Sequence, residues 1–473
     1  MSGTLRIVRR VGFATATALA LAIASVVGYR TLTAPPSSLL RPWHQAIADE
    51  LPAATLATTT WSDYLTHEKR LLDTVDQAIA ESIESADEHV ANRYAAMSPM
   101  HRVRLARDWN RSYELQPVGD TRGIVVLLHG LTDSPYRLRH LASHYQARGF
   151  LALSPRLPGH GTVPGALTQV QWQQWLAVAK IAMREAHVRN TKDLPLHLVG
   201  YSNGAALALM VSLDAIEDTT LPRPDRIVLL SPMIGVGELG RFAGVLGWPA
   251  ALPSFAGAAW IDVLPEYNPF KYNSFPVNAA RQSSLLTREL DSRLLLVGSE
   301  QLAPILAIQS LADDTVSTAA VIAMFERLNA RHELVLIDID RSALVDGLLY
   351  NHLLPAEDLL GNGDYRAAVL SNRGRTDGTL VERRRSASIW TEHATTLRYP
   401  FGVYSLSHIA LPFPCDDPLY GLSPRSDEGF GIALGALAVR GERGLLRVSQ
   451  DDLTRMKCNP FFSDVLARID HSL

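Results

Sequence analysis

The chain has 473 residues, of which 47% are hydrophobic and 20% are charged, the proportions of an ordinary globular protein. This length accommodates two or three domains, or one α/β domain with large insertions. The formal net charge is −3 and no basic stripe is interleaved with aromatic residues, so a nucleic-acid partner is not expected.

The N-terminus has the pattern of an export signal. Arg6, Arg9 and Arg10 precede an uncharged run over residues 11–29, which is about as long as a bilayer span. The sequence therefore predicts a signal peptide or membrane anchor in residues 1–30. We expect an uncleaved transmembrane helix with the arginines in the cytoplasm and the rest in the periplasm or exterior. The alternative is a cleaved signal, which leaves a secreted or periplasmic protein.

Two segments separate this run from the main domain. Residues 31–60 begin with a Pro- and Ser-containing stretch and are interpreted as a linker. From Trp61 to Tyr94, apolar residues recur at steps of three, four or seven, which is typical of one face of a helix. Residues 61–111 are therefore predicted to form an N-terminal helical extension that packs on the main domain.

From about residue 112 to residue 473, the pattern alternates between strand and helix. The predicted strands are Gly123–Leu128, Phe150–Leu153, Leu196–Val199, Arg226–Leu230, Ile305–Ile308 and Glu333–Ile339. The predicted helices are Arg137–Arg148, Trp172–Ala186, Ala205–Ile216 and Ala280–Glu300. This alternation predicts an α/β fold with a mostly parallel sheet and helices on both faces. A Gly-, Pro- and aromatic-rich stretch indicates a cap insertion over about 233–300, and residues 341–398 are interpreted as a second insertion.

A candidate nucleophile lies between the third strand and its helix. Ser202 is the centre of a G-x-S-x-G motif, with Gly200 and Gly204 on either side. A serine on such a sharp strand-to-helix turn is held above the sheet edge, at a helix N-terminus that favours negative charge. We therefore predict that Ser202 is a catalytic nucleophile.

An oxyanion formed during acyl transfer needs two fixed N–H donors. The residue after the nucleophile, Asn203, supplies one, and Leu131, in the loop after the first strand, is predicted to supply the other. His129 in the same loop is predicted to be structural, and His160 to form hydrogen bonds within its own loop.

A serine nucleophile also needs a histidine and an orienting carboxylate, in the chain order Ser, acid, His. Asp313 follows the strand after the cap and is preferred to Asp314, because Val316 anchors the loop while Asp313 points inward. Asp338 and Asp340 are the outside candidates.

The predicted histidine is His408, in a dense loop of small polar and aromatic residues over 404–421. The other histidines lie before a strand, within the second insertion or at the chain end. Cys415 and Cys458 are predicted to form a disulfide bond that braces this loop, as two cysteines of an exported protein often do.

The motifs HGLTDSP, RLPGHGT, GYSNGAAL, ADDTVS and LSHIALPF together resemble the bacterial α/β-hydrolases of the serine aminopeptidase-like and monoacylglycerol-lipase-like group, which includes carboxylesterases. The resemblance covers about 120–235 and 300–421. It implies the α/β-hydrolase fold, the triad Ser202, Asp313 and His408, and the oxyanion donors Leu131 and Asn203. It does not transfer a substrate.

The expected activity is hydrolysis of a carboxylic ester, of a lipid or another small acyl substrate, through an acyl-serine intermediate. A peptidase, an acyltransferase and a non-catalytic membrane-tethered interaction protein remain alternatives. No metal or organic cofactor is implied. Four cap aromatics could line an acyl pocket or only pack the cap: Phe242, Trp248, Phe255 and Trp260.

Overall fold

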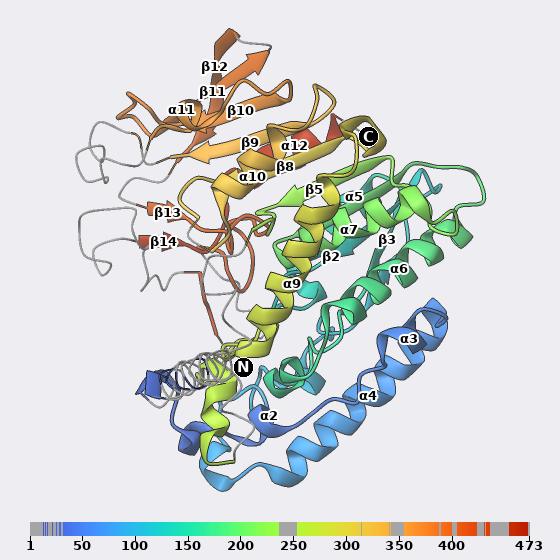
Figure 1. Ribbon diagram of the computed structural model, residues 1–473, viewed down its shortest axis with the longest axis vertical. Coiled ribbons are helices and arrows are strands. Elements are labelled where there is room, and N and C mark those ends of the chain that lie inside the picture. Colours follow the sequence, from blue (N-terminus) through green and yellow to red (C-terminus); the bar gives the residue numbers. More distant parts are fainter. Residues whose placement is uncertain are drawn as a thin grey trace, which may run out of the picture.

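The computed structural model describes residues 32–235, 253–313, 315–339, 341, 354–386, 389–399, 404–422, 430, 432–435 and 454–471, with scattered positions between 13 and 29. Within these residues a ten-stranded sheet runs through the molecule (Figure 1). Its order is β1-β3-β2-β4-β5-β8-β9-β10-β11-β12. The strands are β1 (Tyr113–Leu115), β2 (Gly123–Leu128), β3 (Phe150–Ser154), β4 (Leu196–Tyr201), β5 (Arg226–Leu230), β8 (Ile305–Ser310), β9 (Glu333–Asp338), β10 (Arg366–Ser371), β11 (Thr379–Ser386) and β12 (Ile389–Arg398).

The middle of the sheet is parallel, from β3 through β10, while β1, β11 and β12 pair antiparallel with their neighbours. Every residue of β2 and β4 is buried, as expected for strands covered on both faces; β2 is a continuous apolar run, and β4 is apolar except for His197. The chain order reverses at β2, which has β3 on one side and β4 on the other. In open α/β sheets, ligands bind beyond the carboxyl ends of the strands at such a reversal.

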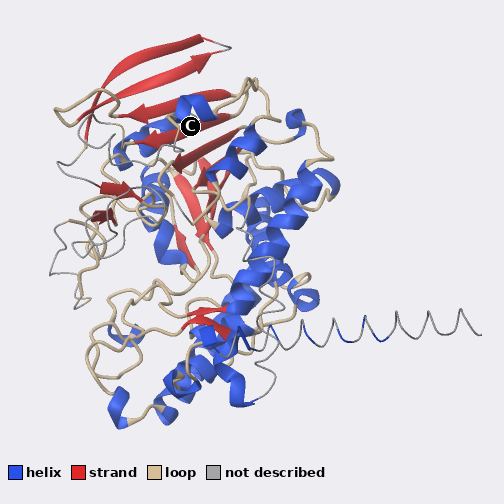
Figure 2. Ribbon diagram, turned by 60° about the vertical axis from the view of Figure 1, so that its left-hand side comes forward, coloured by secondary structure: helices blue, strands red, loops and turns tan. Residues whose placement is uncertain are grey.

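Helices cover both faces of the sheet (Figure 2). Alternate residues of β2 point into two separate cores, one shared with α6, α7, α9 and α10 and the other with α5 and α12. The helices longer than one turn are α4 (Trp61–Ser82), α5 (Arg139–Ala147), α6 (Trp172–Arg189), α7 (Asn203–Glu217), α9 (Val277–Leu294), α10 (Thr318–Phe325) and α12 (Phe462–Asp470). The short helices are α2 (Pro42–Gln45), α3 (Ala53–Leu56) and α11 (Ala356–Leu359). Two small sheets pair β6 (Trp260–Asp262) with β7 (Phe275–Pro276) and β13 (Tyr404–Leu406) with β14 (Thr454–Met456).

The N-terminal extension is shorter as a helix than the sequence predicts. Helix α4 is capped by the Thr60 side chain and ends at Ser82, although the apolar spacing continues to Tyr94. The apolar residues after Ser82 do not extend the buried face of the helix. Val90 is 62% exposed, and Tyr94 lies in a loop, where it stacks on Trp43. The buried face of α4 joins the main core through Trp61 and Tyr64.

The region interpreted as a second insertion contributes three strands to the main sheet. β10 pairs parallel with β9, and β11 and β12 continue the sheet as an antiparallel hairpin. These strands lie at the opposite end of the molecule from α4 (Figure 1).

The anchor prediction falls on residues 1–30, most of which lie outside the described residues. Among the residues that are described, no helix combines the length and the apolar character that a membrane crossing requires.

Candidate active site

Ser202 lies on the turn between β4 and α7, with φ of 53° and 4% of its surface exposed. Its N–H donates to the Leu230 carbonyl at 3.0 Å, and its own carbonyl accepts from the Met233 N–H at 3.2 Å. A positive φ is costly for a residue with a side chain and persists where the surroundings enforce it, commonly at functional sites. These contacts to the end of β5 and the residues after it hold the turn in that strained state.

Both glycines of the motif are required by packing rather than by their own φ angles. A Cβ atom at Gly204 would lie 2.1 Å from the Leu128 carbonyl oxygen, and one at Gly200 would lie 2.5 Å from the Ala205 Cα. The first contact brings the start of α7 against the end of β2. The absence of side chains at these positions therefore brings Ser202 close to the loop after β2.

The two predicted oxyanion donors lie at the same sheet edge. Asn203 is the first residue of α7, where backbone N–H groups lack partners within the helix. Its side-chain oxygen accepts from the Ser283 hydroxyl at 2.8 Å, which fixes the residue from helix α9. Leu131 follows the His129–Gly130 pair that comes directly after β2.

His129 holds the loop after β2, which carries the predicted oxyanion donor Leu131, in agreement with the structural role predicted for it. Its Nδ1 donates to the Gly130 carbonyl at 2.9 Å and its Nε2 accepts from the Leu157 N–H at 3.1 Å. Burial lowers its pKa to about 4, so the ring is neutral near pH 7. His160 also stays within its loop, where Nδ1 lies 3.0 Å from the Pro158 carbonyl and burial lowers the pKa.

Asp313 follows β8 in a tight turn. Its Oδ1 accepts from the Thr315 N–H at 2.9 Å and the Val316 N–H at 3.3 Å, and its Oδ2 accepts from the Gln309 amide at 3.4 Å. The carboxylate is fully buried. Val316 is buried and its N–H donates to Asp313, in agreement with the prediction that this valine anchors the loop.

His408 comes next to this carboxylate, with its Nδ1 3.6 Å from the Asp313 Oδ1. The imidazole ring is also parallel to the Tyr201 ring, at 6.2 Å between centroids. Tyr201 is the residue before Ser202. The structure thus brings Asp313 and His408 together. The His408 ring also lies parallel to the ring of the residue that directly precedes Ser202.

The competing acid candidate that can be assessed is engaged elsewhere. Asp338 is paired with Arg341 at 3.0 Å and accepts from the Ala356 N–H. Asp314 and Asp340 lie outside the described residues.

Two of the other histidines are remote from the sheet edge that carries Ser202. His332 lies just before β9, where its Nδ1 accepts from the Ile305 N–H at 3.3 Å. His393 lies on β12 beside Thr391.

The histidine loop is cross-linked by a disulfide bond between Cys415 and Cys458, whose Cα atoms are 4.9 Å apart. Beside it, the Asn459 N–H donates to the Phe413 carbonyl at 2.7 Å. The bond joins the loop that carries His408 to the start of the C-terminal helix segment.

Sequence reasoning missed the charged residues that brace the site. Arg156, fully buried after β3, pairs with Glu50 of the predicted linker at 2.7 Å and with Glu68 of α4, in the N-terminal extension, at 3.3 Å. The next residue, Leu157, donates its N–H to His129. Helix α4 is therefore linked to the loop after β2 by two successive contacts, Glu68 with Arg156 and Leu157 with His129. Arg156 is the first residue of the RLPGHGT motif, but the motif carries no signal of its partners, which lie 88 and 106 positions away in the chain.

Of the four aromatic candidates for an acyl pocket, only the side chain of Trp260 is among the described residues. Trp260 is buried and its ring lies edge-on to His44 of α2 at 5.0 Å, so it packs the cap against the predicted linker. Phe242, Trp248 and the side chain of Phe255 lie outside the described residues.

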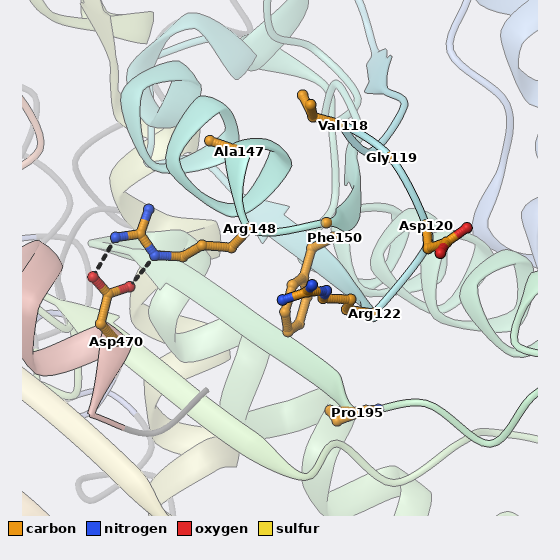
Figure 3. A pocket seen from close by; sticks show the side chains of 10 residues that line it. Val118, Gly119, Asp120, Arg122, Ala147, Arg148, Phe150, Pro195 and Asp470 are labelled. Carbon is orange, nitrogen blue, oxygen red and sulfur yellow. Dashed lines mark hydrogen bonds and ion pairs between the residues drawn. The ribbon is translucent and has the colours of Figure 1, made fainter.

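A pocket of about 540 Å³ lies at the opposite edge of the sheet (Figure 3). It is lined by Phe150, the first residue of β3, and by Pro195, just before β4, whereas Ser202 follows the last residue of β4. Arg148 and Asp470 form an ion pair at its rim. This pocket is therefore separate from the candidate active site. Among the described residues, no group of His, Cys, Asp and Glu could hold a metal ion.

Comparison with known proteins gives one family match, over residues 119–266, to the family described as serine aminopeptidase, S33. The thermostable monoacylglycerol lipase of Bacillus sp. (strain H-257) is 28% identical over 143 residues, which covers 28% of this chain and 51% of that enzyme. The match thus spans about half the length of this relative.

Solved structures of lower identity are also similar. A soluble variant of the Saccharomyces cerevisiae monoglyceride lipase is 13% identical, with a TM-score of 0.40, over 48% of this chain and 81% of that one. The Paleococcus ferrophilus monoacylglycerol lipase is 18% identical, with a TM-score of 0.36, over 48% of this chain and 87% of that one.

The matched residues 119–266 contain Ser202 and the strands on both sides of it. Together with the order of the parallel strands, this match supports an α/β-hydrolase fold, and over the matched residues the chain is similar to the monoacylglycerol-lipase-like enzymes.

Proposed function

We propose that this protein is a serine hydrolase that cleaves carboxylic esters, with Ser202, Asp313 and His408 as its catalytic triad. The observation that carries the proposal is the contact between His408 and the buried Asp313, beside the ring of Tyr201 that precedes the strained Ser202. A buried carboxylate next to an imidazole selects its tautomer and stabilises the imidazolium that forms during catalysis.

In the proposed reaction, the Ser202 Oγ attacks the ester carbonyl carbon while His408 takes the hydroxyl proton. The N–H groups of Leu131 and Asn203 stabilise the oxyanion. His408 then protonates the leaving alcohol, and the acyl group stays on Ser202. Water, deprotonated by His408, attacks the acyl-serine, releases the carboxylic acid and restores the serine.

The substrate class is a further part of the proposal. The 28% identical relative is named a monoacylglycerol lipase, which supports an acyl ester of a small alcohol. The matched family is described as serine aminopeptidase, and this favours aminoacyl substrates as the second candidate.

A substrate panel separates the two candidates. p-Nitrophenyl esters of rising chain length and a monoacylglycerol are compared with aminoacyl p-nitroanilides, using wild type and Ser202→Ala. We expect turnover of the esters by wild type and loss of that turnover in the variant. Turnover of aminoacyl substrates alone would replace the esterase assignment by a peptidase assignment.

We also propose that residues 1–30 export the protein and anchor it to the inner membrane, on the basis of the arginines and the uncharged run that follows. Fractionation of cells expressing the full chain, with protease added to spheroplasts, tests this proposal. A protein that remains in the cytosolic fraction and resists the protease would refute it.

A further inference from the structure

One buried side chain contacts three segments of the candidate active site: the loop after β2, the strand end before Ser202 and the loop that carries His408. Arg137, in the turn Pro135–Leu138 before α5, is only 2% exposed. Its guanidinium donates to the Asp133 carboxylate and, at 3.2 Å, to the Ile409 carbonyl. It also lies over the Tyr201 ring, 5.3 Å from the centroid.

Each of these neighbours is adjacent to a proposed catalytic group. Asp133 is two residues after Leu131, which carries an oxyanion N–H. Ile409 directly follows His408, and Tyr201 directly precedes Ser202. The contacts run through a carboxylate, a backbone carbonyl and an aromatic face, so the guanidinium fixes both backbone and side chains.

The surroundings restrict the guanidinium strongly. The rings of Phe413 and Tyr420, from the histidine loop, lie 4.6 and 5.3 Å from its Cζ. Its charge is compensated by Asp133, whose pKa is lowered by Arg137 and by Lys271 although burial opposes this. A planar guanidinium presents its donors in a fixed arrangement and stacks on aromatic faces, whereas an ammonium group on a flexible stem fixes the relative positions of its partners less well.

We propose that Arg137 is a positioning residue that sets the mutual geometry of the oxyanion loop, the nucleophile turn and the histidine loop. The inference rests on the proposed function and extends it. Arg137 touches neither substrate nor reacting atoms, and it acts through Asp133, Tyr201 and Ile409. Its loss would leave the catalytic groups present but displaced relative to one another.

The test measures catalysis separately from folding. Arg137→Met and Arg137→Lys are compared with wild type for kcat and KM on a p-nitrophenyl ester, and for the rate at which a fluorophosphonate probe modifies the serine. Arg102→Met is the matched control, because Arg102 is also partly buried and pairs with Asp76 and Asp108 within the N-terminal extension. Thermal unfolding is recorded for each variant, and rates are measured below the lowest transition.

We expect Arg137→Met to lower kcat and the phosphonylation rate about 100-fold with little change in KM, since displacement by about 1 Å costs that much. Arg137→Lys is expected to recover part of both rates. Arg102→Met should lower thermal stability and leave kcat unchanged.

If folded Arg137→Met keeps a kcat close to that of Arg102→Met, Arg137 is merely structural and the inference is wrong. If Arg137→Met does not fold, kcat and the phosphonylation rate are measured on Asp133→Asn and Arg137→Lys instead. Lowered rates in these folded variants support the inference, and rates equal to those of Arg102→Met refute it. A wild-type chain that neither reacts with the probe nor cleaves esters would instead refute the proposed function itself.

Discussion

At the scale of single residues, the site depends on a strained serine between two obligatory glycines. Ser202 has a positive φ, and Gly204 lies against the Leu128 carbonyl, so the backbone of α7 is pressed onto the end of β2. The strain is useful because it raises the hydroxyl above the sheet edge and aligns the N–H of Asn203 at the helix start.

Replacing Gly204 with alanine tests this close contact. The added Cβ would lie 2.1 Å from a backbone carbonyl oxygen, so the helix must move. We expect a loss of about 1–3 kcal/mol in the free energy of unfolding, as for an overpacked core, together with loss of esterase activity. Urea denaturation and ester hydrolysis measure the two effects.

Gly119→Ala is the control, because its φ is +78° but nothing lies within 4 Å of the added atom. It should cost stability through backbone strain and leave activity intact. Equal effects of the two substitutions on activity would contradict the steric argument.

The choice of Asp313 over Asp338 is a second prediction at this scale. An asparagine at 313 can still accept from the Thr315 and Val316 N–H groups, but it favours the wrong tautomer of His408. We expect Asp313→Asn to lower kcat about 10⁴-fold with a small change in stability.

Asp338→Asn is the comparison, since Asp338 is paired with Arg341. It should destabilise the fold and leave kcat of the folded protein nearly unchanged. If kcat instead depends on Asp338 and not on Asp313, the acid has been assigned to the wrong strand.

Two residues of the proposed triad have a strong local signal in the sequence, because Ser202 and Asp313 each directly follow a buried, mostly apolar strand. His408 has no such signal and is predicted only by eliminating the other histidines. The contacts of Arg137 could not be predicted, since Asp133 is local but Ile409 is 272 positions away and pairs only through the fold.

At the scale of elements, the buried strands were the most predictable. Gly123–Leu128 and Arg226–Leu230 have the predicted bounds, because a strand buried on both faces is a continuous apolar run. The strands β11 and β12 were not predicted, because they carry many charged residues and β12 is largely exposed. Strands of this kind lack the apolar run by which a buried strand is detected, and only β12 lies at the edge of the sheet.

The segment before β1 is an integral part of the fold, because Glu50 of the predicted linker and Glu68 of α4 supply the counter-charges of a buried arginine. Arg156 is fully buried and contacts Glu50 and Glu68. Removing the partners of a buried charge costs about 3–5 kcal/mol, while replacing the whole group by apolar residues is often neutral.

We therefore expect Glu50→Gln with Glu68→Gln to lower the free energy of unfolding strongly, and Arg156→Met added to this pair to restore much of it. Chemical denaturation of the double and triple variants measures the recovery. If the triple variant is less stable than the double variant, the carboxylates do not serve to compensate the arginine.

At the scale of the whole molecule, neutral buried histidines make stability depend on pH. Burial lowers the pKa of His44, His129 and His197 to about 4 from the usual 6.5. Between these two values the unfolded chain binds protons that the folded chain does not. Stability is therefore fully present above about pH 6.5 and decreases as the pH falls toward 4.

Each of these histidines contributes up to about 3 kcal/mol to this loss. Glu68 and Glu266 act in the opposite sense over part of the range, because burial raises their pKa. The contribution of one histidine is therefore isolated by His197→Gln, which retains a polar side chain beside the Tyr145 hydroxyl.

Denaturation of wild type and His197→Gln at several pH values between 7 and 4.5 provides the measurement. The variant should lose less stability than wild type as the pH falls. Identical slopes for the two proteins would show that His197 does not stay neutral in the fold.

The central claim is that Ser202 becomes nucleophilic because the fold brings it together with His408 and Asp313. Peptide mapping of the adduct formed with a fluorophosphonate tests it most directly. We predict one adduct per chain, on Ser202, formed far more slowly in His408→Ala. An adduct on a different residue, or equal labelling of Ser202 in wild type and His408→Ala, would contradict the claim.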